Sequence, residues 1–332
     1  WRHQLVEERN SRFEGGSQTR SSHPWPQRKT GFMQRPILVS KKIGTKVLTF
    51  DNSGTSVMAL NQVTFQDEQS YPTSFRVGSD INKADFNPEG TQVAGTLGNI
   101  LFIVCTSTGK VLEKVTLPAH CNDVCFFENG RIMIATNKNT ILVYSGKDLV
   151  KEIALKEEAT TVAGIGKDIW VGSKVFDDDE EGQVFRFSSE SYESLGEVQV
   201  SSSKVTCFNA GNTGRLLAIG SGNGLIAFYD IKESKLISND LKYHTMPINT
   251  IVFNPDDTKC LSGAHEKDVH LWDTVNLKNL EKFQSKAFFT VDIVRASASV
   301  NQLFFENDGF TSFGTDGSIN DGPSTKVNSD AD

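Results

Sequence analysis

Two successive stretches of the chain align without a gap: VTCFNAGNTGRLLAIGSGNGLIAFYD at residues 205–230 and INTIVFNPDDTKCLSGAHEKDVHLWD at residues 248–273. Gly220 and Asp230 recur 43 residues further on as Gly263 and Asp273, and Ile248 takes the place of Val205. Both stretches end in an aromatic residue followed by Asp. A repeat of about 40–45 residues that closes on an aromatic-Asp pair is typical of a four-stranded propeller blade. The two stretches therefore predict a β-propeller.

The second stretch has the local pattern of strands joined by turns. Residues 248–253 are rich in β-branched side chains, and residues 254–257, with the sequence NPDD, have turn composition. Residues 268–272 alternate polar and apolar side chains, as a half-buried strand does. Residues 220–224, GSGNG, resemble a phosphate-binding loop, but a strand pattern follows where that loop needs a helix, so the glycines indicate a tight turn.

Similar strand-turn-strand elements recur along the chain and divide it into seven units. The units are approximately residues 37–75, 76–115, 116–154, 155–198, 199–239, 240–282 and 283–320. Seven blades of this size need roughly 300 residues, which suits a chain of 332. We predict an all-β fold with a single seven-bladed WD-repeat β-propeller and disordered N- and C-terminal tails.

The domain boundaries follow from the same units and from the composition of the ends. Residues 1–36 mix Arg, Ser, Gln, Gly and Pro with almost no apolar periodicity, which predicts a disordered basic extension. The propeller is expected over residues 37–320 and a disordered tail over residues 321–332. The last unit has no closing aromatic strand. We therefore expect residues 36–47 to supply a strand that closes the ring.

Composition and charge narrow the classes of function. The content of 37% hydrophobic and 23% charged residues is that of a soluble globular protein. The longest apolar run, residues 100–105, is far shorter than a membrane span, so we expect no membrane insertion. The net charge is −7, with +4 in residues 1–35 and therefore −11 in the remainder. An acidic body repels phosphate backbones, so nucleic acid is not an expected partner.

The five cysteines are odd in number and lie mostly within apolar strand patterns, which predicts buried, reduced thiols. Cys121 and Cys125, with His120 beside them, are the only candidates for a thiolate metal site. Their spacing does not match a zinc motif and no second pair follows, and both side chains are expected on one face of a strand. We expect no metal and no cofactor.

The chain contains no GxSxG, HExxH or Walker sequence, so we predict that the protein is not an enzyme. An acidic segment interrupts the fourth unit, and it consists of Asp177, Asp178, Asp179, Glu180 and Glu181. These carboxylates are either a solvated hairpin tip or a contact for a basic protein surface or a cation. They are our candidate partner-binding residues.

The sixth unit resembles a WD repeat beyond its aromatic-Asp end. Tyr243-His244 occupies the place of the Gly-His dipeptide of that family, in which His, Ser or Thr, a turn Asp and Trp form a hydrogen-bonded set. The resemblance assigns that structural network to His244, Ser262, Glu266, Trp272 and Asp273, with Glu266 where Asp is usual. His244 and His265 are alternatively metal ligands; we favour the network for His244 and an exposed turn for His265.

Residues 122–283 resemble, blade by blade, the C-terminal propeller of actin-interacting protein 1. The residues that carry the resemblance are 129–132, 141–144, 217–220, 225–230, 243–250 and 253–256. This resemblance implies a monomeric, cytoplasmic protein of the actin cytoskeleton that cooperates with ADF/cofilin in filament disassembly. Members of that family have two propellers, and much of their binding surface involves the other one. The alternative is a general WD-repeat scaffold that assembles a multiprotein complex in signalling, trafficking or chromatin.

Overall fold

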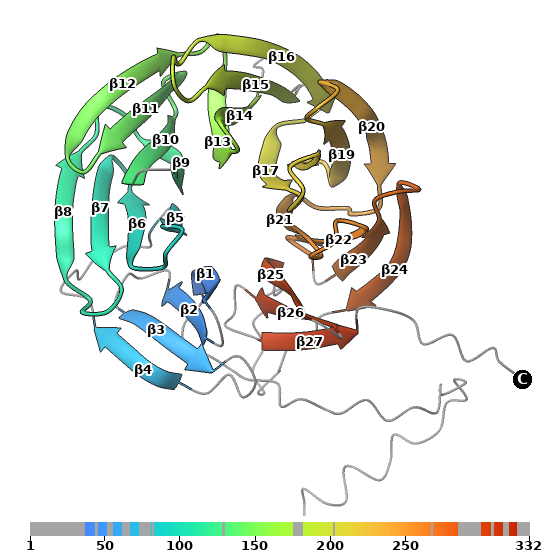
Figure 1. The fold of residues 1–332 in the computed structure, drawn as a ribbon, viewed down its shortest axis with the longest axis horizontal. Helices are drawn as coiled ribbons and strands as arrows, with labels where there is room; N and C mark the ends of the chain where they lie inside the picture. Colours follow the sequence, from blue (N-terminus) through green and yellow to red (C-terminus); the bar gives the residue numbers. More distant parts are fainter. Residues whose placement is uncertain are drawn as a thin grey trace, which may run out of the picture.

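The computed structural model describes an all-β protein. The described residues are 37–43, 46–51, 56–61, 67–72, 81, 83–127, 130–174, 182–201, 203–266, 268–284, 300–306, 309–314 and 319–323. These residues form 27 strands in seven antiparallel sheets and contain no α-helix, as predicted (Figure 1). Within these ranges, no helix is long and apolar enough to cross a membrane.

Each sheet is a meander of strands that follow one another in sequence. The first three sheets comprise β1 (Ile37–Ile43), β2 (Lys46–Asp51), β3 (Ser56–Asn61) and β4 (Asp67–Pro72); β5 (Lys83–Phe86), β6 (Gln92–Leu97), β7 (Ile100–Cys105) and β8 (Val111–Thr116); and β9 (Cys121–Phe126), β10 (Arg131–Thr136), β11 (Thr140–Ser145) and β12 (Asp148–Ala154). The next three comprise β13 (Glu158–Ile165), β14 (Asp168–Lys174), β15 (Gly182–Ser188) and β16 (Ser194–Ser201); β17 (Val205–Ala210), β18 (Leu216–Ser221), β19 (Leu225–Asp230) and β20 (Lys235–Lys242); and β21 (Ile248–Phe253), β22 (Lys259–Ala264), β23 (Asp268–Asp273) and β24 (Lys278–Gln284). The last sheet comprises β25 (Val300–Glu306), β26 (Gly309–Gly314) and β27 (Ile319–Pro323).

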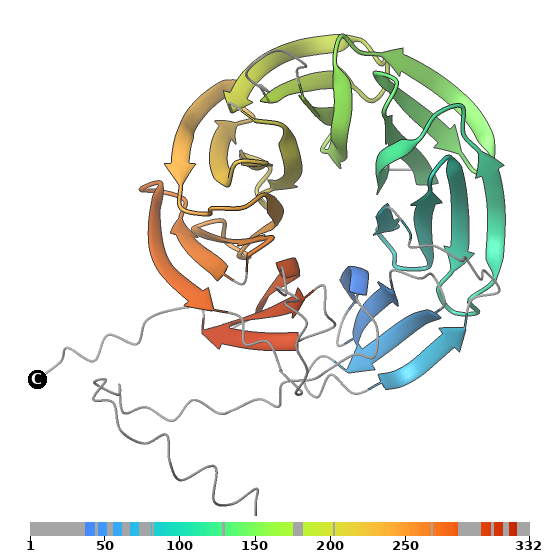
Figure 2. The same cartoon turned by 180° about the vertical axis from the view of Figure 1, so that it is seen from behind.

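The seven sheets stand around a central axis as blades of a propeller. The first strand of each sheet lies nearest the axis and the last strand forms the rim, in both views of the ring (Figures 1 and 2). Neighbouring inner strands lie side by side around the whole circle, including β25 and β1. The blades follow the predicted units within several residues, and the last described strand ends three residues beyond the predicted boundary at 320.

Ring closure differs from the prediction that an N-terminal strand joins the last blade. β1 pairs with β2 in the first sheet, and the described part of the last sheet has three strands, all from residues 300–323. The short β1–β2 connection places these strands in a hairpin, and the inward-facing Val39 packs with Phe50 against Phe86 and Phe102 of the second sheet. Local pairing therefore places β1, and the ring closes by packing of β1 against β25.

The hydrophobic core lies between the blades. Each core cluster combines side chains of two neighbouring sheets, as where Trp170 and Val184 of the fourth sheet contact Leu217 and Tyr229 of the fifth. The ring planes of Trp170 and Tyr229 meet edge to face, with centroids 5.4 Å apart. Because both faces of a blade are covered, a middle strand such as β7 is buried over its four central residues, whereas a rim strand such as β8 alternates half-buried and exposed residues.

Candidate functional site

Six inner strands contain a β-bulge close to their first residue, and four of these bulges lie in the third to sixth sheets. In β9, Cys121 and Asp123 are the register partners of Thr136 and Ala135 in β10, so Asn122 is an extra residue between them. The corresponding extra residues in β13, β17 and β21 are Thr160, Thr206 and Asn249. A bulge redirects a side chain out of the regular alternation of the strand. All four of these polar side chains line a single cavity.

This cavity, which we call the channel mouth, has a volume of about 350 Å³. Its lining comes from the beginnings of inner strands, from Pro247 in the loop before β21 and from the ends of the second strands β14 and β22, in five of the seven sheets. Lys83 begins β5, Lys204 precedes β17 and His265 follows β22. The propeller therefore gathers at one opening residues that lie far apart in sequence.

The channel mouth carries more positive than negative charge. The one carboxylate among its described lining residues, Glu158, lies 3.2 Å from the Lys174 ammonium through Oε2, and Glu158 Oε1 accepts a hydrogen bond of 2.9 Å from Asn122. Glu158 and Lys174 are half-buried register partners in β13 and β14. The charge of Glu158 is thus balanced by a cation that is held beside it.

Lys83 and Lys204 differ from Lys174, because no carboxylate among the described residues forms an ion pair with them. Both side chains are exposed, and neither makes a hydrogen bond or ion pair with another residue that the structure describes. Burial lowers the pKa of His265, and the positive charges of Lys83 and Lys204 lower it further. The electrostatic potential at the channel mouth is therefore positive, although the chain as a whole carries −7.

Sequence reasoning did not predict the channel mouth, although a signal is present. Six units contain a small or branched apolar residue followed by Asn or Thr at or near the start of the inner strand. These pairs are Ile81-Asn82, Cys121-Asn122, Ala159-Thr160, Val205-Thr206, Ile248-Asn249 and Val300-Asn301. Aligning the units on this pair would have brought together Asn122, Thr160, Thr206 and Asn249, which line the channel mouth.

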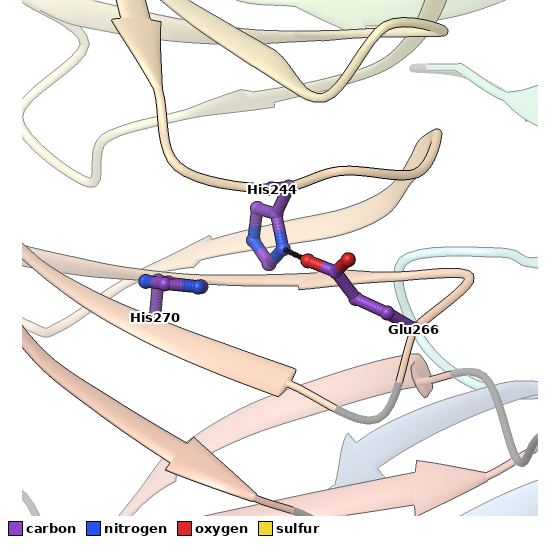
Figure 3. A group of neighbouring side chains, drawn as sticks. All are labelled: His244, Glu266 and His270. Atoms are coloured by element: carbon purple, nitrogen blue, oxygen red, sulfur yellow. Dashed lines mark hydrogen bonds and ion pairs between the residues drawn. The ribbon is translucent and has the colours of Figure 1, made fainter.

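The blade network predicted for the sixth unit forms a continuous chain of hydrogen bonds. Trp272 Nε1 donates to Ser262 Oγ (2.8 Å), and Ser262 Oγ lies 2.7 Å from His244 Nε2. His244 Nδ1 lies 2.6 Å from Glu266 Oε1, the contact drawn in Figure 3. Thr245 donates to the same carboxylate from its backbone N–H and its hydroxyl. Glu266 thus takes the place that the WD pattern gives to Asp.

The pKa shifts fit a neutral imidazole in this chain. Burial lowers the pKa of His244, against the hydrogen bond to Glu266, which raises it. Burial raises the pKa of Glu266, but the hydrogen bonds from Thr245 and His244 outweigh it and the pKa lies below its ordinary value. Neutral His244 then donates from Nδ1 to Glu266 and accepts at Nε2 from the Ser262 hydroxyl.

Ser262, His244 and Glu266 have the order of a Ser–His–acid catalytic triad. Ser262 and His244 are only 0% and 1% exposed, and Ser262 Oγ also accepts the indole N–H of Trp272. A nucleophile needs access to its substrate, which burial inside the blade denies. The arrangement therefore holds the strands of the sixth sheet together.

His244, Glu266 and His270 also bring three metal-binding groups within 4.8 Å of one another (Figure 3). Both nitrogens of His244 already hold hydrogen bonds, Nδ1 with Glu266 and Nε2 with Ser262, so His244 would have to break one of them to bind an ion. Asn279 lies 3.0 Å from His270 Nδ1, and Nε2 has no partner among the described residues. Burial and the neighbouring His244 lower the pKa of His270 to about 4, so the ring is neutral. These contacts describe a packed blade interior.

The remaining predicted residues lie elsewhere. Asp273 stands outside the network: its Oδ1 accepts the backbone N–H of Val275 and Asn276, and Asp230 accepts that of Glu233 in the same way after β19. The Asp of each aromatic-Asp pair thus accepts hydrogen bonds from the turn that follows its strand.

His265 is exposed, as expected, but lies at the channel mouth. The acidic segment 177–181 lies outside the described residues, as do residues 1–36.

Cys121 and Cys125 differ from the expectation of a common face. The bulge at Asn122 turns the strand between them, so that Cys121 packs between the second and third sheets and Cys125 between the third and fourth. Burial raises the pKa of Cys121 to about 12 and that of Cys125 well above its ordinary value. Cys105 is not buried, and a hydrogen bond with Ser107 lowers its pKa to about 7. All five cysteines are free.

Comparison with known proteins supports the fold and leaves the function open. Residues 171–318 match the family model of the nucleolar protein 10-like N-terminal domain, a β-propeller, over less than half of the chain. A crystal structure of the computationally designed Ika8 protein is similar with a TM-score of 0.63 and 14% identity over 88% of this chain and 97% of that one. In total 1709 solved chains match, so likeness of fold selects no function.

No curated protein matches the sequence. The resemblance to actin-interacting protein 1 therefore remains a prediction from the residues alone. What the repeats, the sheets and the family match show together is that the chain is a β-propeller.

Proposed function

We propose that the protein is a non-catalytic scaffold that binds a partner protein on the face that carries the channel mouth. The observation that carries the proposal is the pair of exposed lysines, Lys83 and Lys204, which have no anionic partner among the described residues. Charges on such a surface steer a complementary partner and set its orientation. The propeller fold supplies a rigid frame for them.

Exposed apolar side chains beside the channel mouth also favour this face of the propeller as the partner-binding surface. The loop between β20 and β21 contains Tyr243 and Met246, which are 54% and 47% exposed, and Pro247 of the same loop lines the channel mouth. Tyr243 is held edge-to-face on the Trp272 ring at 5.3 Å. Aromatic residues and Met are enriched in protein interfaces. A partner would thus contact both charge and apolar surface within one region.

The proposal is tested by quantitative affinity capture with three forms of the full chain: the original, a Lys83→Glu/Lys204→Glu variant, and a Lys151→Glu/Lys235→Glu variant with the same charge change on exposed residues of β12 and β20. We expect a discrete set of proteins to be lost with the mouth variant and kept with the rim variant. Equal recovery with all three forms would place the binding surface elsewhere.

Actin filament disassembly together with ADF/cofilin is the second candidate function, because it predicts a specific partner. It rests on the sequence similarity over residues 122–283. Co-sedimentation of the full chain with actin filaments, with and without ADF/cofilin, tests it directly. Binding that requires cofilin and is followed by filament loss would support this function; no effect on cofilin-decorated filaments leaves the general scaffold.

The acidic segment 177–181 is a second proposed contact, for a basic surface of the partner. It joins Lys174 of β14 to Gly182 of β15. Changing its five carboxylates to Ser and Asn should slow association at low salt and leave the fold unchanged. An unchanged association rate would identify the segment as a solvated turn.

The nucleolus is the place that the matched family's description suggests for a scaffold of this kind. A fluorescent fusion of the full chain distinguishes the two candidates. Nucleolar signal would favour a nucleolar scaffold, and filament-associated signal would favour the actin reading.

A further inference from the structure

We propose that the channel mouth is a binding site for a phosphate group, carried either by a small molecule or by a phosphorylated side chain of a partner. The inference deepens the proposed scaffold function, on which it rests for the partner-borne case. It is carried by Lys83 and Lys204 and by the bulge residue Thr206, which lines the same cavity and whose buried hydroxyl has no hydrogen-bond partner among the described residues.

The charges match a dianion. With Glu158 and Lys174 balancing each other, the two exposed lysines leave a formal charge of two at the cavity. A phosphate monoester carries about −1.5 to −2 at pH 7, whereas one carboxylate carries −1. The cations at the site are lysines, which bind phosphate as point charges.

One neutral donor is available to the same ligand. The bulge in β17 places Thr206 at the cavity, where its buried hydroxyl has no hydrogen-bond partner among the described residues, and a phosphate offers three oxygens that accept hydrogen bonds. Thr160 already donates to the Val205 carbonyl (2.6 Å), and the Asn122 amide donates to Glu158 and to the Ala159 carbonyl, so these two side chains shape the cavity wall and do not bind the anion. Their bonds fix the wall in place, so less ordering is needed when a ligand binds.

The size of the cavity leaves room for more than a phosphate. A volume of about 350 Å³ lies at the lower end of the range of ligand sites, roughly 300–1,000 Å³. Burial lowers the pKa of His265, and the charges of Lys83 and Lys204 lower it further, so both ammonium groups act at this opening. The site therefore presents positive charge in a chain whose net charge is −7.

Isothermal titration calorimetry on the full chain tests the site with inorganic pyrophosphate, a phosphoserine peptide and the same peptide without phosphate. We expect the phosphate-bearing probes to bind and the unmodified peptide to bind at least tenfold more weakly. Changing Lys83 or Lys204 to Gln should weaken binding about tenfold each, as loss of a charge-assisted hydrogen bond does. Lys151→Gln and Lys235→Gln on rim strands are the matched controls.

The outcomes separate the source of the phosphate and can overturn the proposal. Tighter binding of the phosphopeptide than of pyrophosphate identifies a protein-borne phosphate, and the reverse identifies a small molecule. No binding of either probe, or binding that Lys83→Gln and Lys204→Gln leave unchanged, overturns the site. If the phosphate probes fail while captured partners still depend on Lys83 and Lys204, the scaffold function stands without a phosphate.

Discussion

At the scale of single residues, Glu266 shows how much a blade network tolerates. The additional methylene of Glu, compared with Asp, does not prevent contact with His244, because Glu266 approaches from the turn between β22 and β23 and accepts from Thr245 as well. The chain from Trp272 to Glu266 satisfies buried polar groups that would otherwise cost about 1–3 kcal/mol each.

Trp272 should be essential for the stability of its blade. It is completely buried, and its indole N–H donates to Ser262. Trp272→Ala should lower the free energy of unfolding by about 3–5 kcal/mol. Val275→Ala, at an exposed residue three positions later, should change it by less than about 0.5 kcal/mol. Urea denaturation of both variants measures the difference, and an unchanged midpoint for Trp272→Ala would show that the strand register is wrong.

Asp85 should make stability depend on pH. Its carboxylate accepts the Phe126 backbone N–H across the blade boundary (2.8 Å), and burial raises its pKa from 3.8 to about 6. The folded state therefore binds the proton more tightly than the unfolded state, and this contribution is complete below about pH 4 and lost as the pH rises through 6. Asn is neutral throughout and keeps an acceptor oxygen.

We accordingly expect Asp85→Asn to be more stable than the original protein at pH 7.5, by on the order of 1–3 kcal/mol, and equal to it near pH 4. Thermal unfolding at both pH values measures this effect. Asp148→Asn, at an exposed residue, is the control. A variant that is less stable at pH 7.5 would show that Asp85 is charged and stabilising in the folded protein.

At the scale of elements, the tight turns between strands depend on particular glycines. Gly224, in the turn from β18 to β19, has a φ of +83°, and a Cβ there would lie 2.3 Å from the His244 carbonyl oxygen. Gly166, between β13 and β14, has a φ of +59° and nothing within 4 Å of an added Cβ. The first turn therefore combines a left-handed backbone with close contact to the next blade, and the second has the backbone conformation alone.

Substituting these two glycines compares the cost of a left-handed backbone conformation with the additional cost of a steric clash. Gly166→Ala should cost about 1–2 kcal/mol for the left-handed conformation. Gly224→Ala should cost at least about 1 kcal/mol more, because the backbone that carries His244 must move. Chemical denaturation gives both values. Equal costs would mean that the loop before β21 yields freely to the added methyl group.

At the scale of the whole molecule, the propeller is a ring of sheets whose stability lies between the blades. Because the described residues contain no helix, far-ultraviolet circular dichroism should show a β spectrum. A helix content above about a quarter, near the average of globular proteins, would contradict the fold. The spectrum of the full chain is the direct measurement.

Much of this fold is determined locally and was predictable. The aromatic-Asp pairs at Asp230 and Asp273 and the strand alternation specify four-stranded units, because side-chain period and turn composition act over a few residues. The blade network was predicted from the resemblance to WD repeats, and the pairing of β22 with β23 brings Ser262 and Trp272 within hydrogen-bonding distance. The closure of the ring was not predictable from the repeat, since the β1–β2 hairpin competes with a shared last blade.

The sequence by itself determined the blades, from patterns within each repeat, and their number, from the count of repeats. Only the tertiary structure decided the channel mouth. Lys83, Lys204 and His265 belong to different repeats, and bulges rather than strand alternation direct Asn122 and Thr160 toward the axis. Side chains converge there because seven sheets share one centre, and that convergence is a property of the closed ring which no single repeat contains.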